Sequence, residues 1–336
     1  MDILTHGLLG GTLALSCSKK NETRDAATVG FIAALLADAD ALIQSSSDPL
    51  LTLEYHRQFT HSLIFIPVGA LLVSLVLWLA FKILKRPLGF RRIYLYAFLG
   101  CATSGFLDAC TSYGTHLLWP FTDERLAWSI VPIFDPLFSL TLGAAMLAGL
   151  RWRKTLPARL GLLLAAGYLS LGWFQHQRAE EAIRATALLR GHATEKLTVK
   201  PTMGNLLLWR SIYRSGGVYH VDAVRVGVGG AGKIYPGTTV RAFDPHRDLP
   251  TLSTASVLYR DIGRFDFFSS GYLALHPEDP GLLGDVRYAM LPTSIRPLWG
   301  IRLDLQHAET HAPFEASRRM SRREIEQFIG MLRGAD

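Results

Sequence analysis

The sequence predicts an α-helical membrane domain of five or six transmembrane helices, followed by an extramembrane α+β domain. Of the 336 residues, 49% are apolar and 19% are charged, whereas a soluble domain carries about 25% charged residues. The mean hydropathy is +0.21. Residues 1–175 hold 14 Lys or Arg and 11 Asp or Glu, and residues 176–336 hold 21 and 17. We therefore expect the membrane domain over 1–175 and the extramembrane domain over 176–336.

Long apolar runs define the expected membrane helices. The clearest, residues 62–84, exceeds the roughly twenty residues that cross a bilayer core. The run 3–18 would reach roughly 24 Å at about 1.5 Å per residue, so it is either a short span or a re-entrant helix. No basic segment precedes it, which argues against a signal peptide. The other expected spans are residues 26–43, 93–110, 130–150 and 158–174.

The charges of the loops predict the orientation. Loops 18–25, 85–92 and 151–159 carry 11 Lys or Arg residues, while loops 44–61 and 111–129 carry only Arg57 and Arg125. The positive-inside rule places the first set in the cytoplasm. We therefore expect a multi-pass protein of the bacterial inner membrane with residues 176–336 on the outer, periplasmic side.

Residues 176–336 alternate between helix and strand signals. Residues 175–189 are typical of a helix, and Ser215-Gly216-Gly217 predicts a hairpin between strands at 205–214 and 218–228. Ser321 and Glu324 have the spacing of a capping box that opens a last helix to about residue 332. Further strands are expected at 265–272, 285–291 and 298–305.

The sequence supports neither nucleic-acid binding nor a cysteine-based zinc or disulfide site. The net charge of +7 is explained by basic cytoplasmic loops, and no dense basic stripe with interleaved aromatic residues indicates nucleic acid. The spacing of Cys17, Cys101 and Cys110 fits neither a zinc ribbon nor a disulfide framework. We expect these three cysteines to be small buried residues.

The few acidic and histidine residues of the apolar half gather near the expected outer boundary. Asp38, Asp40 and Asp108 lie near the C-termini of outward-running helices, where the helix dipole disfavours an anion by a few tenths to about 1 kcal/mol. A bound cation would offset that cost. Asp135 precedes Pro136 and therefore also fits a helix N-cap. The full candidate metal set is His6, Asp38, Asp40, His56, His61, Asp108 and Asp135.

Imidazole and carboxylate groups together suit Zn²⁺, Mn²⁺ or Fe²⁺. His56 and His61, five residues apart, would point about 140° apart on one helix, so they are expected to converge from different elements. A catalytic site needs about three protein ligands, and the set is larger. We therefore expect one or two divalent ions, Zn²⁺ first and Mn²⁺ as the alternative, about 3.5–4 Å apart if paired.

Such a site predicts hydrolysis of a phosphoester by a metal-activated water. Asp40, Arg57 and Asp108 are the expected catalytic residues. Arg57 and Arg125 have the forked geometry that binds phosphate oxygens. The competing interpretations are a structural partner of a nearby Asp for Arg57 and a headgroup-facing residue for Arg125.

Several segments of residues 1–145 resemble, in their order, the YdjM-type family of bacterial membrane-bound metal-dependent hydrolases. The segments are Met1-Asp2-Ile3-Leu4-Thr5-His6-Gly7, Ala37-Asp38-Ala39-Asp40, His56-Arg57-Gln58-Phe59-Thr60-His61-Ser62, Phe106-Leu107-Asp108-Ala109-Cys110-Thr111-Ser112-Tyr113-Gly114-Thr115, Trp119-Pro120-Phe121 and Phe134-Asp135-Pro136. That family is remotely similar to zinc-dependent phospholipase C and P1 nuclease. The resemblance implies a metal-dependent hydrolase, a plausible phosphoester substrate, and functional roles at His6, Asp38, Asp40, His56, His61 and Asp108. The sequence departs from the family in reading Ala37-Asp38-Ala39-Asp40, where the family usually has Pro-Asp before the second Asp.

Three functions therefore follow from the sequence. The first is a hydrolase that acts on a phospholipid or lipid-linked phosphate at the outer leaflet, with the bilayer as its partner. The alternative is an ion or solute transporter with the Asp/His cluster as its cation pathway. It would favour ionisable residues at mid-membrane, whereas run 62–84 has none before Lys82. The third is a structural anchor for the external domain.

Overall fold

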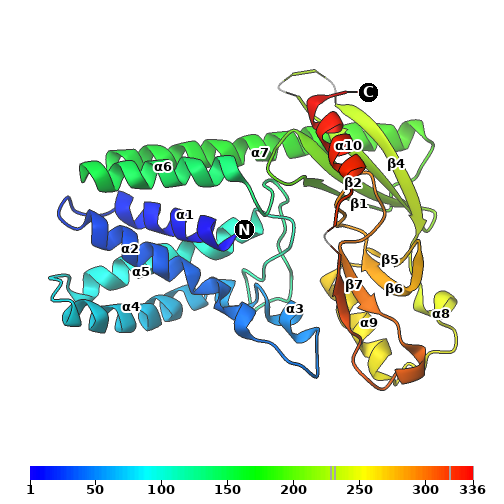
Figure 1. Ribbon diagram of the computed structural model, residues 1–336, viewed down its shortest axis with the longest axis horizontal. Helices are drawn as coiled ribbons and strands as arrows, with labels where there is room; N and C mark the ends of the chain where they lie inside the picture. The colour runs from blue at the N-terminus through cyan, green and yellow to red at the C-terminus, as the bar shows by residue number, and fades with distance from the viewer. Residues whose placement is uncertain (228, 231, 318, 336) are drawn as a thin grey trace. The chain divides into compact units, whose positions relative to one another are not determined.

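The computed structural model describes residues 1–227, 229–230, 232–317 and 319–335. The chain divides into two compact units (Figure 1). The first contains Met1–Ile43, Tyr55–Phe174 and Met203–Asn205, and the second contains Gln44–Glu54, Gln175–Thr202 and Leu206–Asp336. The loop Gln44–Glu54 thus groups with the second unit, although the sequence places it among the membrane helices.

The first unit is helical. Its helices are α1 (Ile3–Ser16), α2 (Thr23–Leu35), α4 (Phe65–Ile83), α5 (Phe90–Ala109), α6 (Pro136–Trp152) and the first part of α7 (Leu156–Leu189). Two 3₁₀ turns, η1 (Ala37–Leu42) and η2 (Phe59–His61), precede and follow the loop at 44–54. The turns that join α1 to α2, α4 to α5 and α6 to α7 lie together at one end of these helices, and the N-terminus lies at the other (Figure 1).

Small residues let α1, α2 and α5 approach closely. A Cβ atom on Gly30 would lie 2.5 Å from the carbonyl oxygen of Gly10, and one on Gly100 would lie 2.3 Å from that of Gly30. The Ser104 hydroxyl on α5 donates a hydrogen bond of 2.8 Å to the carbonyl of Ala34. This is the packing that membrane helices use, because lipid offers no hydrophobic force between them.

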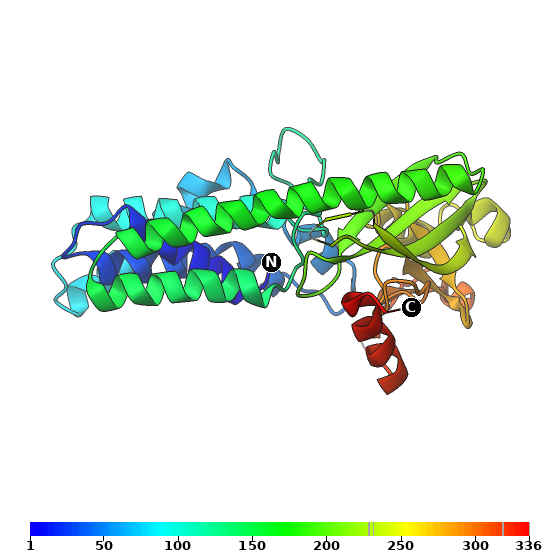
Figure 2. The same cartoon turned by 90° about the horizontal axis from the view of Figure 1, so that it is seen from above.

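Among the described residues, two helices, α4 and α7, are long and apolar enough to cross a membrane, and α1 is a shorter apolar helix. The predicted number of five or six spans is therefore not confirmed. α2 has 13 residues and ends at Leu35 instead of continuing to residue 43, and α6 has 17. Figure 2 shows α7 as one unbroken helix, which agrees with the prediction of a helix at 175–189.

The second unit contains two antiparallel four-stranded sheets, each in sequential strand order. The first sheet consists of β1 (Lys196–Pro201), β2 (Leu208–Ser215), β3 (Val218–Arg225) and β4 (Lys233–Arg241). The second consists of β5 (Leu273–His276), β6 (Asp279–Asp285), β7 (Trp299–Arg302) and β8 (Phe314–Ala316). The remaining elements are α3 (Leu51–Tyr55), α8 (Pro245–Asp248), α9 (Val257–Phe268), η3 (Leu305–His307) and α10 (Arg322–Arg333). The prediction of a helical region followed by an α+β domain is thus correct at this level.

The predictions of a hairpin turn and of a helix cap are confirmed. β2 and β3 pair across Gly216 and Gly217, whose φ angles of 56° and 75° are left-handed, a conformation that glycine adopts without steric cost. Ser321 and Glu324 form the predicted capping box of α10. A strand at 298–305 is confirmed only over Trp299–Arg302, because Leu305 opens η3.

Two predicted strands are wrong. Residues 265–268 belong to α9, whose buried residues Leu258, Ile262, Phe265 and Phe268 recur at helical spacing. Of the strand predicted at 285–291, only Asp285 lies in a strand, as the last residue of β6, and residues 286–291 lie outside the strands. There the buried Arg210 guanidinium donates to the carbonyls of residues 286, 291 and 292, so these carbonyls are not available to a neighbouring strand.

Candidate metal centre

Three candidate metal ligands meet in the first unit. His6 lies near the start of α1, Asp38 on η1 after α2, and Asp108 in the last turn of α5. One ligand atom from each lies within 4.8 Å of the others. They meet because α1 runs opposite to α2 and α5, so that its first turn lies beside the ends of the other two.

Asp108 is the centre of this group, and its side chain is fully buried. His6 Nε2 lies 3.1 Å from Asp108 Oδ1, and the Met1 amino group contacts the same oxygen. His61 Nε2 lies 3.1 Å and Arg57 Nε 3.0 Å from Asp108 Oδ2. One carboxylate is therefore surrounded by imidazole and cationic nitrogens.

The residues fit a divalent cation. Among the described residues, five buried atoms of this cluster have no well-aligned hydrogen-bond partner: the cationic Arg57 Nε and four possible ligand atoms, His6 Nδ1, Asp38 Oδ2, His61 Nε2 and Asp108 Oδ2. Leaving such an atom unsatisfied costs about 1–3 kcal/mol. His6, Asp38 and Asp108 would offer one imidazole and two carboxylates, which are ligand types that suit Zn²⁺. A cation would satisfy several of these atoms at once.

Asp40 serves a different part of the site from Asp38. Two residues apart on a 3₁₀ turn with about three residues per turn, the two side chains point about 120° apart. Asp40 accepts hydrogen bonds from His56 Nδ1 at 2.9 Å, the Arg57 backbone N–H at 2.8 Å and the Thr60 hydroxyl at 2.8 Å. Its carboxylate therefore holds the segment 56–61 in place.

His61 connects the two carboxylates. Its Nδ1 lies 3.2 Å from Asp40 Oδ2, and its Nε2 faces Asp108. Burial alone lowers the pKa of this imidazole, but the two carboxylates outweigh it and raise the pKa above the usual value. A Cβ atom on Gly105 would lie 2.1 Å from the His61 carbonyl oxygen, so the glycine lets the His61 backbone lie directly on α5.

The backbone of Arg57 is in a strained conformation. Its φ angle is 62°, an uncommon value for a residue with a side chain. The buried guanidinium donates to the Thr111 hydroxyl at 2.9 Å, beside its contact with Asp108. It also lies 4.9 Å from the centre of the Tyr113 ring, and the Arg125 guanidinium lies 5.2 Å from the same ring. Both arginines thus contact the Tyr113 ring, and Arg57 pairs with Asp108 as one interpretation expected.

The comparisons with known proteins concern this same half of the chain. The family model described as "YdjM inner membrane protein" matches residues 1–179. The chain belongs to this family. The residues of the cluster around Asp108 all lie inside the matched range. The family description places its members in the inner membrane.

One curated relative is also described as an inner membrane protein. Inner membrane protein YbcI of Escherichia coli (strain K12) is 28% identical over 135 residues, which cover 39% of this chain and 75% of YbcI. No solved structure matches the chain. Residues 180–336 lie beyond the YdjM match.

Asp135 has a structural role in this YdjM protein. It is the N-cap of α6, where Oδ1 accepts the Phe138 N–H at 3.1 Å. Its Oδ2 accepts a hydrogen bond of 2.6 Å from the Tyr168 hydroxyl. Both oxygens are engaged, and Asp135 is not part of the group of three ligands. We therefore leave it out of the metal site.

Three residues of the YdjM site were missed by reasoning on ionisable side chains. Thr60 donates to Asp40, Thr111 accepts from Arg57, and the Tyr113 ring lies against Arg57. All three occur inside the segments that carry the family resemblance. A search for hydroxyl and aromatic residues beside the Asp and His positions would have found them.

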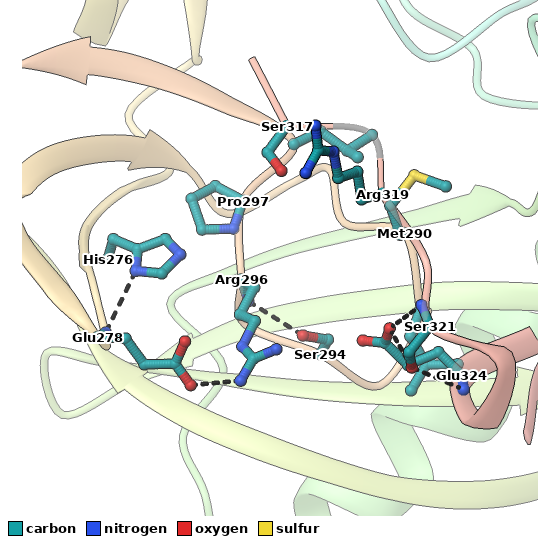
Figure 3. Close-up of a pocket in the computed structure, with 12 residues that line it drawn as sticks. His276, Glu278, Met290, Ser294, Arg296, Pro297, Ser317, Arg319, Ser321 and Glu324 are labelled. Carbon is teal, nitrogen blue, oxygen red and sulfur yellow. Dashed lines mark hydrogen bonds and ion pairs between the residues drawn. The ribbon is translucent and has the colours of Figure 1, made fainter. Parts of the chain in front are cut away.

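The second unit has a cavity of about 360 Å³ (Figure 3). Arg296 pairs with Glu278, while Ser321 and Glu324 complete the cap of α10. His276 Nδ1 accepts the Glu278 N–H. These polar groups form hydrogen bonds and ion pairs with one another, unlike the unsatisfied atoms around Asp108.

Proposed function

We propose that this YdjM protein is a metal-dependent hydrolase of the inner membrane that acts on the phosphoester of a lipid or lipid-linked substrate at the outer leaflet. The observation that carries the proposal is the convergence of His6, Asp38 and Asp108 from three elements, with ligand atoms within 4.8 Å. Buried polar atoms without aligned partners surround the same point.

His6, Asp38 and Asp108 would hold the ion, and His61 is the fourth candidate ligand. Zn²⁺ suits this mixture of imidazole and carboxylate, with Mn²⁺ as the alternative. A bound divalent ion supplies an activated water and neutralises charge on a phosphate. Asp40 and His56 would contribute to a second ion if two are bound.

The residues around the ligands have separate tasks. Asp40 positions His61 and Arg57 through its hydrogen bonds to segment 56–61. Arg57 places a permanent positive charge beside Asp108, where it would pair with a phosphate oxygen of the substrate. Burial of both groups strengthens these interactions, since water screens them little.

The surroundings of the cluster support a lipid substrate. Large apolar residues that are about half exposed flank the ligands in the chain, with Ile3 and Leu4 before His6 and Leu63 and Ile64 after His61. The basic loops at the other end of these helices support a site on the outer side. A substrate with acyl chains would therefore meet apolar surface beside its phosphate.

Metal analysis of the purified protein tests this proposal. We expect the wild type to carry Zn²⁺ or Mn²⁺ and to hydrolyse a lipid phosphoester, and His6→Ala and Asp108→Asn to lose the metal and at least 100-fold in activity. The control is Asp123→Asn, an exposed carboxylate outside the cluster, which should behave as wild type. A wild type without bound metal would contradict the proposal. Metal uptake into proteoliposomes without hydrolysis would favour the transport alternative.

A further inference from the structure

The loop between α5 and α6 contains an exposed apolar stretch in the first unit. Its residues Leu117-Leu118-Trp119-Pro120-Phe121 include no charged side chain. The Leu118 side chain is 44% exposed and that of Phe121 is 80% exposed. Contiguous apolar surface of this kind usually marks a place that a partner or a membrane covers. We call residues 117–121 the apolar loop, and its exposure points to an apolar surface outside the chain.

The apolar loop is attached to the residues that precede α4. The Leu63 N–H donates a hydrogen bond of 2.9 Å to the Leu117 carbonyl, and the Leu117 side chain is buried. The Phe59 ring contacts both Phe65, with 5.5 Å between ring centres, and Trp119, with 6.2 Å. The backbone of the loop is therefore fixed beside the first turn of α4, while its exposed side chains face outward.

α4 carries an apolar surface that the loop extends. This helix is long and apolar enough to cross a membrane, and the chain belongs to a family of inner membrane proteins. Large apolar side chains are exposed along α4, namely Val68, Leu71, Leu72, Leu75, Val76 and Leu79. Leu63 and Ile64 continue this surface before the first turn, with 51% and 48% exposure. The apolar loop joins it there, through the hydrogen bond between Leu63 and Leu117.

The residue types fit the boundary between lipid and water. Tryptophan is enriched at that boundary, where one edge of its ring meets lipid and the other meets water. A second aromatic pair lies at the end of α5, where Phe106 is 51% exposed and its ring centre lies 5.4 Å from that of Trp128. α5 ends where α4 begins (Figure 1). The charged residues 123–125 follow the apolar loop directly, as expected of a loop that enters the boundary and returns to water.

We propose that the apolar loop is a membrane anchor whose Leu118 and Phe121 side chains insert into the phospholipid leaflet at the end where α4 begins. The Arg57 carbonyl accepts the His116 N–H at 3.0 Å, so the anchor also fixes the depth of segment 56–61 relative to the lipid headgroups. This inference goes beyond the proposed function and does not depend on a bound metal. It rests on α4 as a membrane helix.

Site-directed spin labelling tests the anchor in the full-length protein. The protein is reconstituted into vesicles of phosphatidylethanolamine and phosphatidylglycerol, with its three native cysteines replaced by alanine. One nitroxide label at a time is placed on Leu118→Cys or Phe121→Cys. Leu72→Cys, on the exposed side of α4, is the reference for lipid. Asp123→Cys, an exposed residue just after the apolar loop, is the matched reference for water.

Collisions with two relaxing agents report the surroundings of each label, because molecular oxygen concentrates in lipid and a charge-neutral nickel chelate stays in water. We expect the labels at 118 and 121 to collide with the nickel chelate several-fold less often than the label at 123. They should also collide with oxygen more often than that label. The label at 72 should show the same preference for oxygen more strongly, since it lies deeper.

Three outcomes would overturn the inference. Nickel collisions at 118 and 121 that equal those at 123 would place the loop in water. Few collisions with either agent would mean that a protein surface, such as a second copy of this chain, covers the loop. A water-like reading at 72 would overturn α4 as a membrane helix and the inference with it. A wild type without bound metal would contradict the hydrolase proposal and would leave these readings unchanged.

Discussion

Asp38 and Asp40 show how two neighbouring carboxylates acquire different tasks. Asp38 Oδ2 is buried without an aligned partner among the described residues, whereas Asp40 accepts three hydrogen bonds. A buried carboxylate oxygen without a partner, such as Asp38 Oδ2, is available to a ligand, whereas the hydrogen-bonded carboxylate of Asp40 stabilises the fold. The difference between them is therefore measurable in both stability and metal binding.

We expect Asp40→Asn to lower the free energy of unfolding of the metal-free protein by about 1–3 kcal/mol, because an amide leaves donors such as the Arg57 N–H unsatisfied. Asp38→Asn should leave that stability within about 0.5 kcal/mol of wild type, as changes outside such contacts do, and should abolish metal binding. Thermal unfolding in chelator and a Zn²⁺ titration measure the two effects. Equal loss of stability in both variants would contradict the assignment.

At the scale of elements, helix contacts decide where the ligands lie. α1, α2 and α5 bring His6, Asp38 and Asp108 together only because Gly10, Gly30 and Gly100 allow the backbones to touch. A Cβ atom at one of these glycines would clash with a neighbouring helix and push apart the helices that carry the ligands. Packing far from the cluster therefore controls it.

Two glycine substitutions test this dependence. Gly100→Ala places its Cβ against the Gly30 carbonyl, while a Cβ on Gly167 of α7 meets nothing within 4 Å. We expect Gly100→Ala to cost about 1–3 kcal/mol by overpacking and to weaken metal binding. Gly167→Ala should be neutral or stabilising by up to about 1 kcal/mol. Equal melting temperatures for the two variants would show that the close approach is not needed.

Element prediction succeeded where the signal is local and failed where it is not. The glycine turn after β2 and the Ser321 cap are decided by φ angles and by one side chain, and both were predicted. The aromatic residues of 265–272 favour a strand locally, whereas burial of Leu258, Ile262, Phe265 and Phe268 on one face selects the helix α9 over the first part of this segment.

For the whole molecule, the orientation in the membrane remains a prediction with a direct test. The basic loops predict that residues 176–336 lie outside the cytoplasm. Alkaline phosphatase fused after residue 335 should be active, and the same enzyme fused after Lys154 should be inactive. Green fluorescent protein at the two positions should give the reverse pattern. Phosphatase activity only at Lys154 would place the site on the cytoplasmic side.

The sequence by itself determined the division into an apolar helical part and a polar α+β part, and it singled out the Asp and His residues. Hydropathy and side-chain chemistry are local properties, so they can be read from the chain. Only the tertiary structure decided that Asp38 joins His6 and Asp108, and that the second oxygen of Asp135 accepts a hydrogen bond from Tyr168. Those outcomes depend on which distant backbones pack together, and no local pattern encodes that packing.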